Sequence, residues 1–518
     1  MTDPLLTAAE ATLAERLDEV TLRRAPASAV AITHRGRVVA VAAHGEPRRD
    51  GAATTRGTVF RIASMSKSFL AATALVLRDE GLLDLHLPVT RWVPELAGAQ
   101  IEGHAVGDRI TLSMLMANSA GLGEDNPWGD EHLGESRAFM RDVVGAGLRL
   151  SAHPDTQYQY SNLGQSLIGR AIESVTGRPV EDVIRERLLD PLGLAATRAS
   201  ADLYPPDADL AHGFRTFDDG ESFAAEPYVG TGALGCIGSM FSTVDDIARW
   251  MHFLSSAFDD DASGQSASGP LSTASRREMQ VARTVIAPAI GQFGERELDG
   301  AGYGYGLVVE HDRRFGRIVQ HSGGLPGFSS HMRWHPASGT GIVAFGSSDS
   351  FGAGRIAGLM LHDVLRAVDA PAAVVRPWPQ TVAAAERIDE LLRSGRALTH
   401  PPSWADAGEL ARNVLRDVPA EVRTRRLRAA TDEVGAPDAD ATPLASRIVS
   451  AADASSLRWT VRCATGALVC DLRMLGLREP IVQALEVRVA GENGKPRDEV
   501  ALVTDHHRVT ARERDRRR

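Results

Sequence analysis

The sequence predicts an α/β sandwich: an antiparallel sheet flanked by helices, with an inserted, mainly helical lobe, and a smaller α+β domain after it. Two apolar strand patterns, at 29–32 and 38–43, surround Arg35-Gly36, which is a hairpin signal. Four more strand patterns follow residue 303, whereas the stretch from 82 to about 290 is mostly helix and loop. We therefore expect one sheet assembled from both ends of a domain, with a functional site beside the inserted lobe.

Helical periodicity and stop signals predict the remaining elements of the first domain. Apolar residues at helical spacing predict a helix over 5–23. Gly177 and Pro179 are stop signals for a helix over 162–176. The late strands are expected at 305–310, 317–321, 328–334 and 340–345, followed by a helix at 356–368.

A Pro- and Ala-rich segment divides the chain. We predict a first domain over 1–370, a linker over 371–382 and an accessory α+β domain over 383–518. The accessory domain could cover the functional site or support a homo-oligomer. Its helices are expected at 385–394, 405–417 and 420–434, and its strands at 457–462, 467–473, 481–489 and 500–503.

Composition and charge exclude several classes of protein. With 518 residues, a net charge of −10 and no basic stripe, the chain is not expected to bind nucleic acid. No apolar run reaches the ~18 residues of a membrane span. The N-terminus lacks a signal-peptide pattern, so we expect a cytoplasmic protein. No metal or cofactor is expected, because Cys236, Cys463 and Cys470 have no zinc spacing and His331 and His335 lack a third ligand.

Ser64 and Lys67 stand out in the stretch 60–70, where a strand runs into a helix. They are three residues apart, on one helix face, at the positive end of the helix dipole. The chain has 57 Lys plus Arg, yet its only lysines are Lys67 and Lys495. A desolvated lysine can lose its proton, whereas arginine keeps it. We therefore interpret Lys67 as a base for Ser64 rather than as a surface residue.

Two further motifs follow in order. Tyr-Ser-Asn stands at 160–162, at a loop-to-helix junction, and His-Ser-Gly-Gly stands at 321–324, at a strand end. Ser-x-x-Lys, Tyr-x-Asn and a Gly motif led by Lys or His resemble the penicillin-recognising serine hydrolases, in particular the branch of class C β-lactamases, DD-peptidases and esterases. The resemblance covers residues 10–370 and implies a serine β-lactamase-like fold.

The resemblance also implies catalytic roles. Ser64 would be the nucleophile that forms an ester intermediate. Its base would be Lys67 or Tyr160, and the sequence leaves both open; Tyr158 offers a second register for the tyrosine. The backbone N–H groups of Ser64 and Gly324 would bind the oxyanion.

Three residues are expected to contact the substrate: Asn162, His321 and Gly323. Asn162 would also hold Lys67 in place. The loop 118–122 departs from the family's His-Thr-Ser-Gly-Leu loop, most sharply at its first residue, and we expect this to change loop support rather than chemistry. His321 could instead be a satisfied strand-end histidine without a substrate contact.

His321 decides the predicted activity. Relatives that hydrolyse β-lactams or D-Ala-D-Ala peptides usually carry lysine there, whereas a histidine is mostly neutral at pH 7 and binds a carboxylate weakly. We therefore predict a serine hydrolase of the esterase or amidase type, acting on small esters or amides. The alternatives are a β-lactamase, a D-Ala-D-Ala carboxypeptidase or D-aminopeptidase, and a non-catalytic binding module.

Overall fold

The computed structural model describes residues 3–48, 51–259, 269–287, 291–293, 296–371, 375–399, 404, 410–439, 442–491 and 496. The chain divides into two compact units, Met1–Ala370 and Pro371–Arg518. Each unit has its own buried apolar core. Along the described part of the chain, no helix is both long and apolar enough to cross a membrane.

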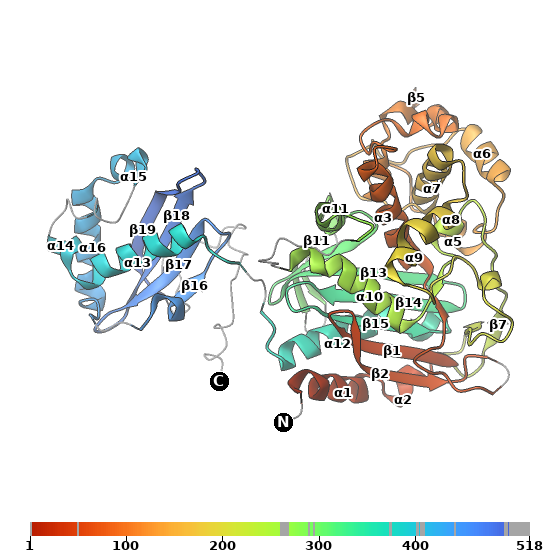
Figure 1. Cartoon of the computed structure of the whole chain (residues 1–518), viewed down its shortest axis with the longest axis horizontal. Coiled ribbons are helices and arrows are strands. Elements are labelled where there is room, and N and C mark those ends of the chain that lie inside the picture. The colour runs from red at the N-terminus through yellow and green to blue at the C-terminus, as the bar shows by residue number, and fades with distance from the viewer. Residues whose placement is uncertain are drawn as a thin grey trace. The chain divides into compact units, whose positions relative to one another are not determined.

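The first unit is built on an antiparallel sheet that joins the two ends of its sequence (Figure 1). β1 (Ala27–His34) pairs on one side with β2 (Arg37–Gly45) and on the other with β15 (Thr340–Gly346). From β15 the sheet continues through β14, β13, β12 and β11 to β10. The predicted sheet from both ends of the domain is confirmed. The bounds are β10 Gly291–Phe293, β11 Arg296–Tyr303, β12 Val308–Asp312, β13 Gly316–Leu325 and β14 Phe328–His335.

Helices cover both faces of this sheet. In β1, Val30 and Ile32 belong to the core formed with α1 and α12, whereas Ala29 and Ala31 belong to the core that includes α3 and α10. Successive side chains of a strand point to opposite faces, so the sheet is buried on both and the predicted α/β sandwich is confirmed. The helices are α1 Pro4–Arg16, α3 Ser66–Asp79, α10 Val244–Ser255 and α12 Ala353–Ala367.

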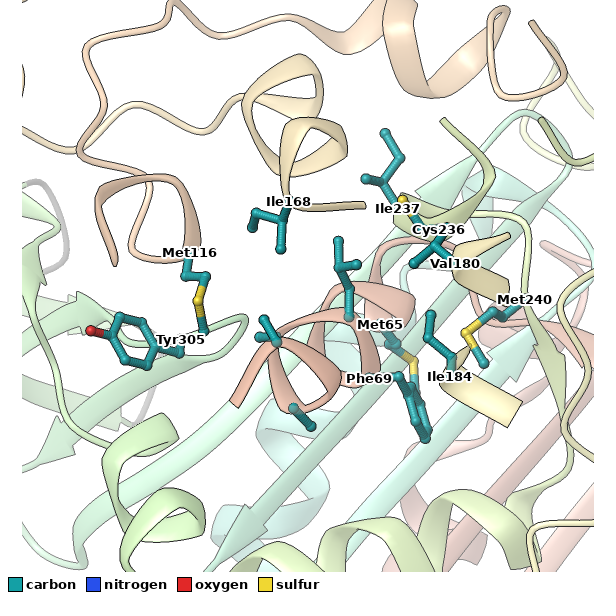
Figure 2. Packing of buried hydrophobic residues seen from close by; sticks show 14 of the residues in the cluster. Met65, Phe69, Met116, Ile168, Val180, Ile184, Cys236, Ile237, Met240 and Tyr305 are labelled. Carbon is teal, nitrogen blue, oxygen red and sulfur yellow. The ribbon is translucent and has the colours of Figure 1, made fainter. Parts of the chain in front are cut away.

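The inserted lobe packs around α3. Figure 2 shows Met65 and Phe69, at and just after the start of α3, among apolar side chains such as Ile168, Ile237 and Met240. In α7, the Ser161 side chain accepts a hydrogen bond from the N–H of Gly164, and the helix ends before a left-handed Gly177, as predicted. The lobe's helices are α4 Leu112–Met116, α5 Asn126–Asp130, α6 Arg137–Gly145, α7 Asn162–Thr176, α8 Val180–Ile184 and α9 Asp190–Leu192.

Two predictions for the first unit are wrong in detail. The helix expected over 5–23 is interrupted, because the Asp18 side chain accepts a hydrogen bond from Thr21 N–H and starts a separate turn, α2 (Glu19–Leu22). The sequence also misses β11, which pairs with β12. Its sequence, Arg-Glu-Leu-Asp-Gly-Ala-Gly-Tyr, is rich in charge and glycine and has no β-branched residue, so pairing rather than propensity makes it a strand.

The second unit is a four-stranded antiparallel sheet, in the order β16-β17-β18-β19, with helices beside it. Its first helix starts at Pro379, inside the predicted linker 371–382, because proline is well suited to the first turn of a helix. The helix expected over 405–417 begins at Arg412, and the strand expected at 500–503 lies outside the described residues. The elements are α13 Pro379–Arg393, α14 Arg396–Thr399, α15 Arg412–Asp417, α16 Ala420–Val434, β16 Ile448–Ser450, β17 Ser456–Arg462, β18 Ala467–Leu475 and β19 Ile481–Val489.

Candidate active site

Ser64 lies at the junction between sheet and lobe. It is the middle residue of a single 3-10 turn, Ala63–Met65, which connects β3 (Phe60–Arg61) to α3. Ala63 has φ 47°, a left-handed conformation that is unusual for alanine and that turns the chain sharply before Ser64. Ser64 is half-buried, whereas the residues next to it are buried. The turn therefore presents one hydroxyl from an otherwise enclosed segment.

The Lys67 amine is next to this hydroxyl. Its Nζ lies 2.9 Å from Ser64 Oγ and 3.1 Å from the carbonyl oxygen of Ile237. Lys67 is fully buried. Desolvation lowers its pKa to about 7, although the Cys236 and Asp125 side chains act in the opposite direction. Near neutral pH, much of Lys67 is therefore a neutral amine in contact with Ser64.

Tyr160 completes this group. Lys67 Nζ lies 5.0 Å from the centroid of its ring. Burial raises the pKa of Tyr160 above the ordinary range of a phenol, and a hydrogen bond with the Ser64 side chain opposes that shift. Tyr160 is therefore a protonated phenol at neutral pH. The hydrogen bond with Ser64 is made by Tyr160, whereas Tyr158 packs on Tyr303 with ring centroids 5.8 Å apart.

His321 is close to this group but is turned inward. It is 3% exposed, its Nδ1 lies 2.6 Å from the Ser322 carbonyl, and its Nε2 lies 2.9 Å from the Tyr303 hydroxyl. Burial, with a contribution from Lys67, lowers its pKa to about 3. The neutral ring donates from Nδ1 and accepts at Nε2, so neither nitrogen is available to a substrate. His321 thus has the contacts of a satisfied strand-end histidine, and the substrate contact expected of it stays a prediction.

Asn162 is held by a residue that the sequence analysis missed. The Asn162 Nδ2 donates to the main-chain oxygen of Asp125 at 3.1 Å. The Lys67 amine, which Asn162 was expected to hold, donates instead to Ser64 and to the Ile237 carbonyl. The Asp125 carboxylate accepts from Ser161 Oγ and from the N–H groups of Asn162 and Leu163, at the start of α7. Asn162 therefore does not hold Lys67 as predicted; it anchors the start of the helix. A role that depends on a loop reaching a distant helix start leaves no local sequence signal.

The two glycines of the third motif have different surroundings. A Cβ on Gly323 would lie 2.3 Å from the Ile62 carbonyl and 2.1 Å from Ser330 Oγ, so this glycine lets β13 pack directly against the Ser64 turn. Gly323 therefore serves packing, and the substrate contact expected of it stays a prediction. A Cβ on Gly324 would meet nothing within 4 Å. β12 pairs with β13 only over 316–320. The part of β13 at 321–325, which contains Gly324, therefore extends past its pairing with β12.

Tyr303 is the other residue that the sequence analysis missed. It is fully buried on β11, and its ring centroid lies 6.1 Å from that of Tyr160 and 5.9 Å from that of His321. It was missed because β11 itself was missed. Within the described residues, no cluster of three or more His, Cys, Asp or Glu side chains is arranged to hold a metal ion.

A buried lysine beside a serine hydroxyl, at the junction of an antiparallel sheet and a helical lobe, defines a serine hydrolase. The family described as Beta-lactamase matches residues 10–363, and the chain belongs to this family.

Individual relatives agree with this assignment. The D-alanyl-D-alanine-carboxypeptidase/endopeptidase AmpH of Escherichia coli is 27% identical over 290 residues, which cover 55% of this chain and 69% of AmpH. The octameric penicillin-binding protein homologue of Pyrococcus abyssi has a TM-score of 0.55 at 19% identity and covers 94% of this chain and 93% of its own. EstCE1, a hydrolase with promiscuous acyltransferase activity, has a TM-score of 0.54 at 22% identity and covers 70% of this chain and 99% of its own. The two solved structures share the fold.

Proposed function

We propose that this protein is an esterase or amidase that acts on small substrates through an acyl-enzyme on Ser64. The observation that carries the proposal is the 2.9 Å contact between Ser64 Oγ and Lys67 Nζ, in which burial lowers the pKa of the amine to about 7. An amine that is partly neutral at physiological pH can act as a general base, which an ordinary surface lysine cannot.

The acylation step follows from this geometry. Neutral Lys67 takes the proton from Ser64 Oγ as that oxygen attacks the substrate carbonyl carbon. The Ile237 carbonyl accepts one N–H of the amine, which helps to leave its lone pair for Ser64. The developing oxyanion accepts from the N–H groups of Ser64 and Gly324. The protonated phenol of Tyr160 then passes a proton to the leaving alcohol or amine and is reprotonated by Lys67.

Hydrolysis of the ester intermediate is the reverse of acylation, with water as the nucleophile. Lys67, neutral again, accepts the proton of the attacking water, directly or through Tyr160. When the tetrahedral intermediate collapses, Ser64 regains its proton and the carboxylic acid leaves. Every proton in the cycle is thus carried by Lys67, Tyr160 or Ser64.

The preference for small esters or amides rests on His321. Its two ring nitrogens are engaged by Ser322 and Tyr303, and burial keeps it neutral. The motif therefore offers no positive charge to a substrate carboxylate at the place where carboxylate-binding relatives carry lysine. A D-Ala-D-Ala carboxypeptidase is the second candidate, because AmpH bears that name.

A substrate panel tests the proposal. Wild type and Ser64→Ala are incubated with short-chain nitrophenyl esters, D-amino-acid amides, a D-Ala-D-Ala peptide and nitrocefin, and both are treated with a fluorophosphonate probe. We expect ester or amide turnover and labelling in wild type, with loss of at least a thousandfold in Ser64→Ala. Turnover of the D-Ala-D-Ala peptide alone would favour the second candidate. Equal labelling of both proteins would overturn the proposal.

Location and assembly are predictions that need separate measurements. We propose a cytoplasmic location, which cell fractionation tests. We also propose a homo-oligomer formed through residues 371–518; the octameric Pyrococcus homologue, which matches most of the chain, supports this idea. Mass photometry of the purified protein would give the number of subunits.

A further inference from the structure

Asn118 has an unusual backbone conformation near the candidate active site. It follows α4, is 3% exposed, and has φ 53°, in the left-handed region. Apart from glycine, asparagine is one of the few residues that adopt this backbone region readily. Such a conformation at a buried position suggests that it serves the contacts made there.

Two contacts of Asn118 lie on either side of Tyr160, and its side chain also interacts with the Tyr303 hydroxyl. The main-chain oxygen of Asn118 accepts from the N–H of Gln159 at 2.9 Å, and its Oδ1 accepts from the N–H of Ser161 at 3.2 Å. One residue therefore holds the backbone before and after the tyrosine. Few side chains could do this, because the second bond needs a short side chain with an acceptor atom.

A neighbouring glutamine fixes the orientation of the Asn118 amide. Gln165 Nε2 donates to the Leu115 carbonyl at 2.8 Å and lies 3.4 Å from Asn118 Oδ1. Because this nitrogen is a donor, the atom of Asn118 that faces it and the Ser161 N–H is the oxygen. Gln165 is itself fully buried, so the arrangement is enclosed.

We propose that Asn118 is a positioning residue that clamps the backbone on both sides of Tyr160 and so sets the phenol against Ser64 and Lys67. The inference rests on the proposed acyl-enzyme function. Asn118 need not touch the substrate; it acts through the position of Tyr160.

A double-mutant cycle tests the inference. Asn118→Gly keeps the left-handed backbone and the main-chain acceptor but removes Oδ1. We expect the kcat for an alkyl ester or amide, whose leaving group takes its proton from Tyr160, to fall about 10- to 100-fold, with KM nearly unchanged, because small misplacements of catalytic groups have effects of this size. In a Tyr160→Phe background, Asn118→Gly should lower kcat by less than about twofold.

Ser119→Ala is the matched control, because Ser119 is the next residue, is equally buried and bonds through Oγ to Asp155 rather than to the tyrosine segment. It should lower the melting temperature as Asn118→Gly does while leaving kcat within about twofold. If Asn118→Gly does not fold, Asn118→Asp keeps the acceptor and should stay within about tenfold of wild type.

The outcomes separate the two proposals. Wild type without Ser64-dependent labelling would contradict the proposed function. Normal labelling with an unaffected Asn118→Gly, or an equal loss in the wild-type and Tyr160→Phe backgrounds, would overturn the role of Asn118 alone. A loss in Asn118→Asp as large as in Tyr160→Phe would do the same.

Discussion

At the scale of single residues, the burial of Lys67 predicts a measurable pH dependence of the reaction. Burial lowers its pKa to about 7, whereas burial raises the pKa of Tyr160 above the ordinary phenol range. The two candidate bases therefore predict different pH profiles. Acylation that needs neutral Lys67 rises with pH and levels off above a midpoint near 7, whereas acylation that needs the Tyr160 phenolate would rise only at strongly alkaline pH.

The first prediction is that pH profile. The rate of fluorophosphonate labelling, measured from pH 5 to 10, should increase with a midpoint of about 7 and then stay level, because the deprotonated amine is the active form. Tyr160→Phe should label more slowly with a similar midpoint. A flat profile, or a midpoint near that of a phenol, would assign the base to another group.

The second prediction concerns stability. The pKa of Lys67 is lowered in the folded protein relative to its ordinary 10.5, so between about pH 7 and 10.5 the unfolded chain binds more protons and stability rises with pH. Lys67→Met removes the buried amine. It should abolish labelling yet raise the free energy of unfolding, most at pH 6 and least near pH 10, as measured by urea titration. Ser64→Ala, which keeps Lys67, should follow the pH dependence of wild type.

At the scale of helices and strands, the feature that matters most for the site is the packing of β13 against the Ser64 turn. Gly323 lets the strand approach the Ile62 carbonyl, and Ser330 Oγ donates to the same oxygen at 2.8 Å. The Ile62 carbonyl, just before the Ser64 turn, thus lies against Gly323 of β13 and accepts a hydrogen bond from Ser330 of β14. The position of Ser64 relative to the strand depends on both.

Paired glycine substitutions provide the third prediction. Gly323→Ala would place a methyl group 2.1 Å from Ser330 Oγ and 2.3 Å from the Ile62 oxygen, so the turn must move. We expect a loss of about 1–3 kcal/mol in stability, as for other overpacked sites, together with slower labelling. Gly324→Ala, where nothing lies within 4 Å, should leave the melting temperature unchanged. Equal melting temperatures for the two variants would refute this account of Gly323.

Some helices, strands and site residues could be predicted from the sequence, and others could not. The strands with alternating or continuous apolar residues, such as β1 and β15, were predictable. The grouping of Ser64, Lys67 and Tyr160 was also predictable, because each lies in a short local motif. β11 was not, because its charges and glycines resemble a loop, and Tyr303 was missed with it. The Ile237 carbonyl could not be found either, because main-chain partners leave no residue type to recognise.

At the scale of the whole molecule, the chain consists of two units with separate cores. The core of the second unit includes the fully buried Trp459 and Cys470, and its own sheet supplies them. An independent core of this kind is the usual property of a domain that folds alone. Ser64, Lys67, Tyr160 and His321 all belong to the first unit.

The fourth prediction follows from this division. A fragment ending at Ala370 should fold, as judged by a cooperative melting curve, and should be labelled at Ser64 at a rate within about threefold of the full chain. The fragment should form a smaller oligomer than the full chain if residues 371–518 form the subunit interface. Ser64→Ala in the same fragment is the control for labelling. A fragment that is folded but unlabelled would show that the second unit contributes to the site.

The pairing of β1 with β15 has a consequence for synthesis on the ribosome. β1, β2 and the Ser64 turn are translated early, whereas β13, β14 and β15 emerge only near the end of the first unit. Until then, one edge of the β1–β2 hairpin has no partner, and an open strand edge is a template for pairing with other chains. The nascent chain thus carries Ser64, the proposed nucleophile, long before the strand that would bind the oxyanion. We expect newly made chains to need chaperone protection and to remain inactive until translation of the first unit is complete.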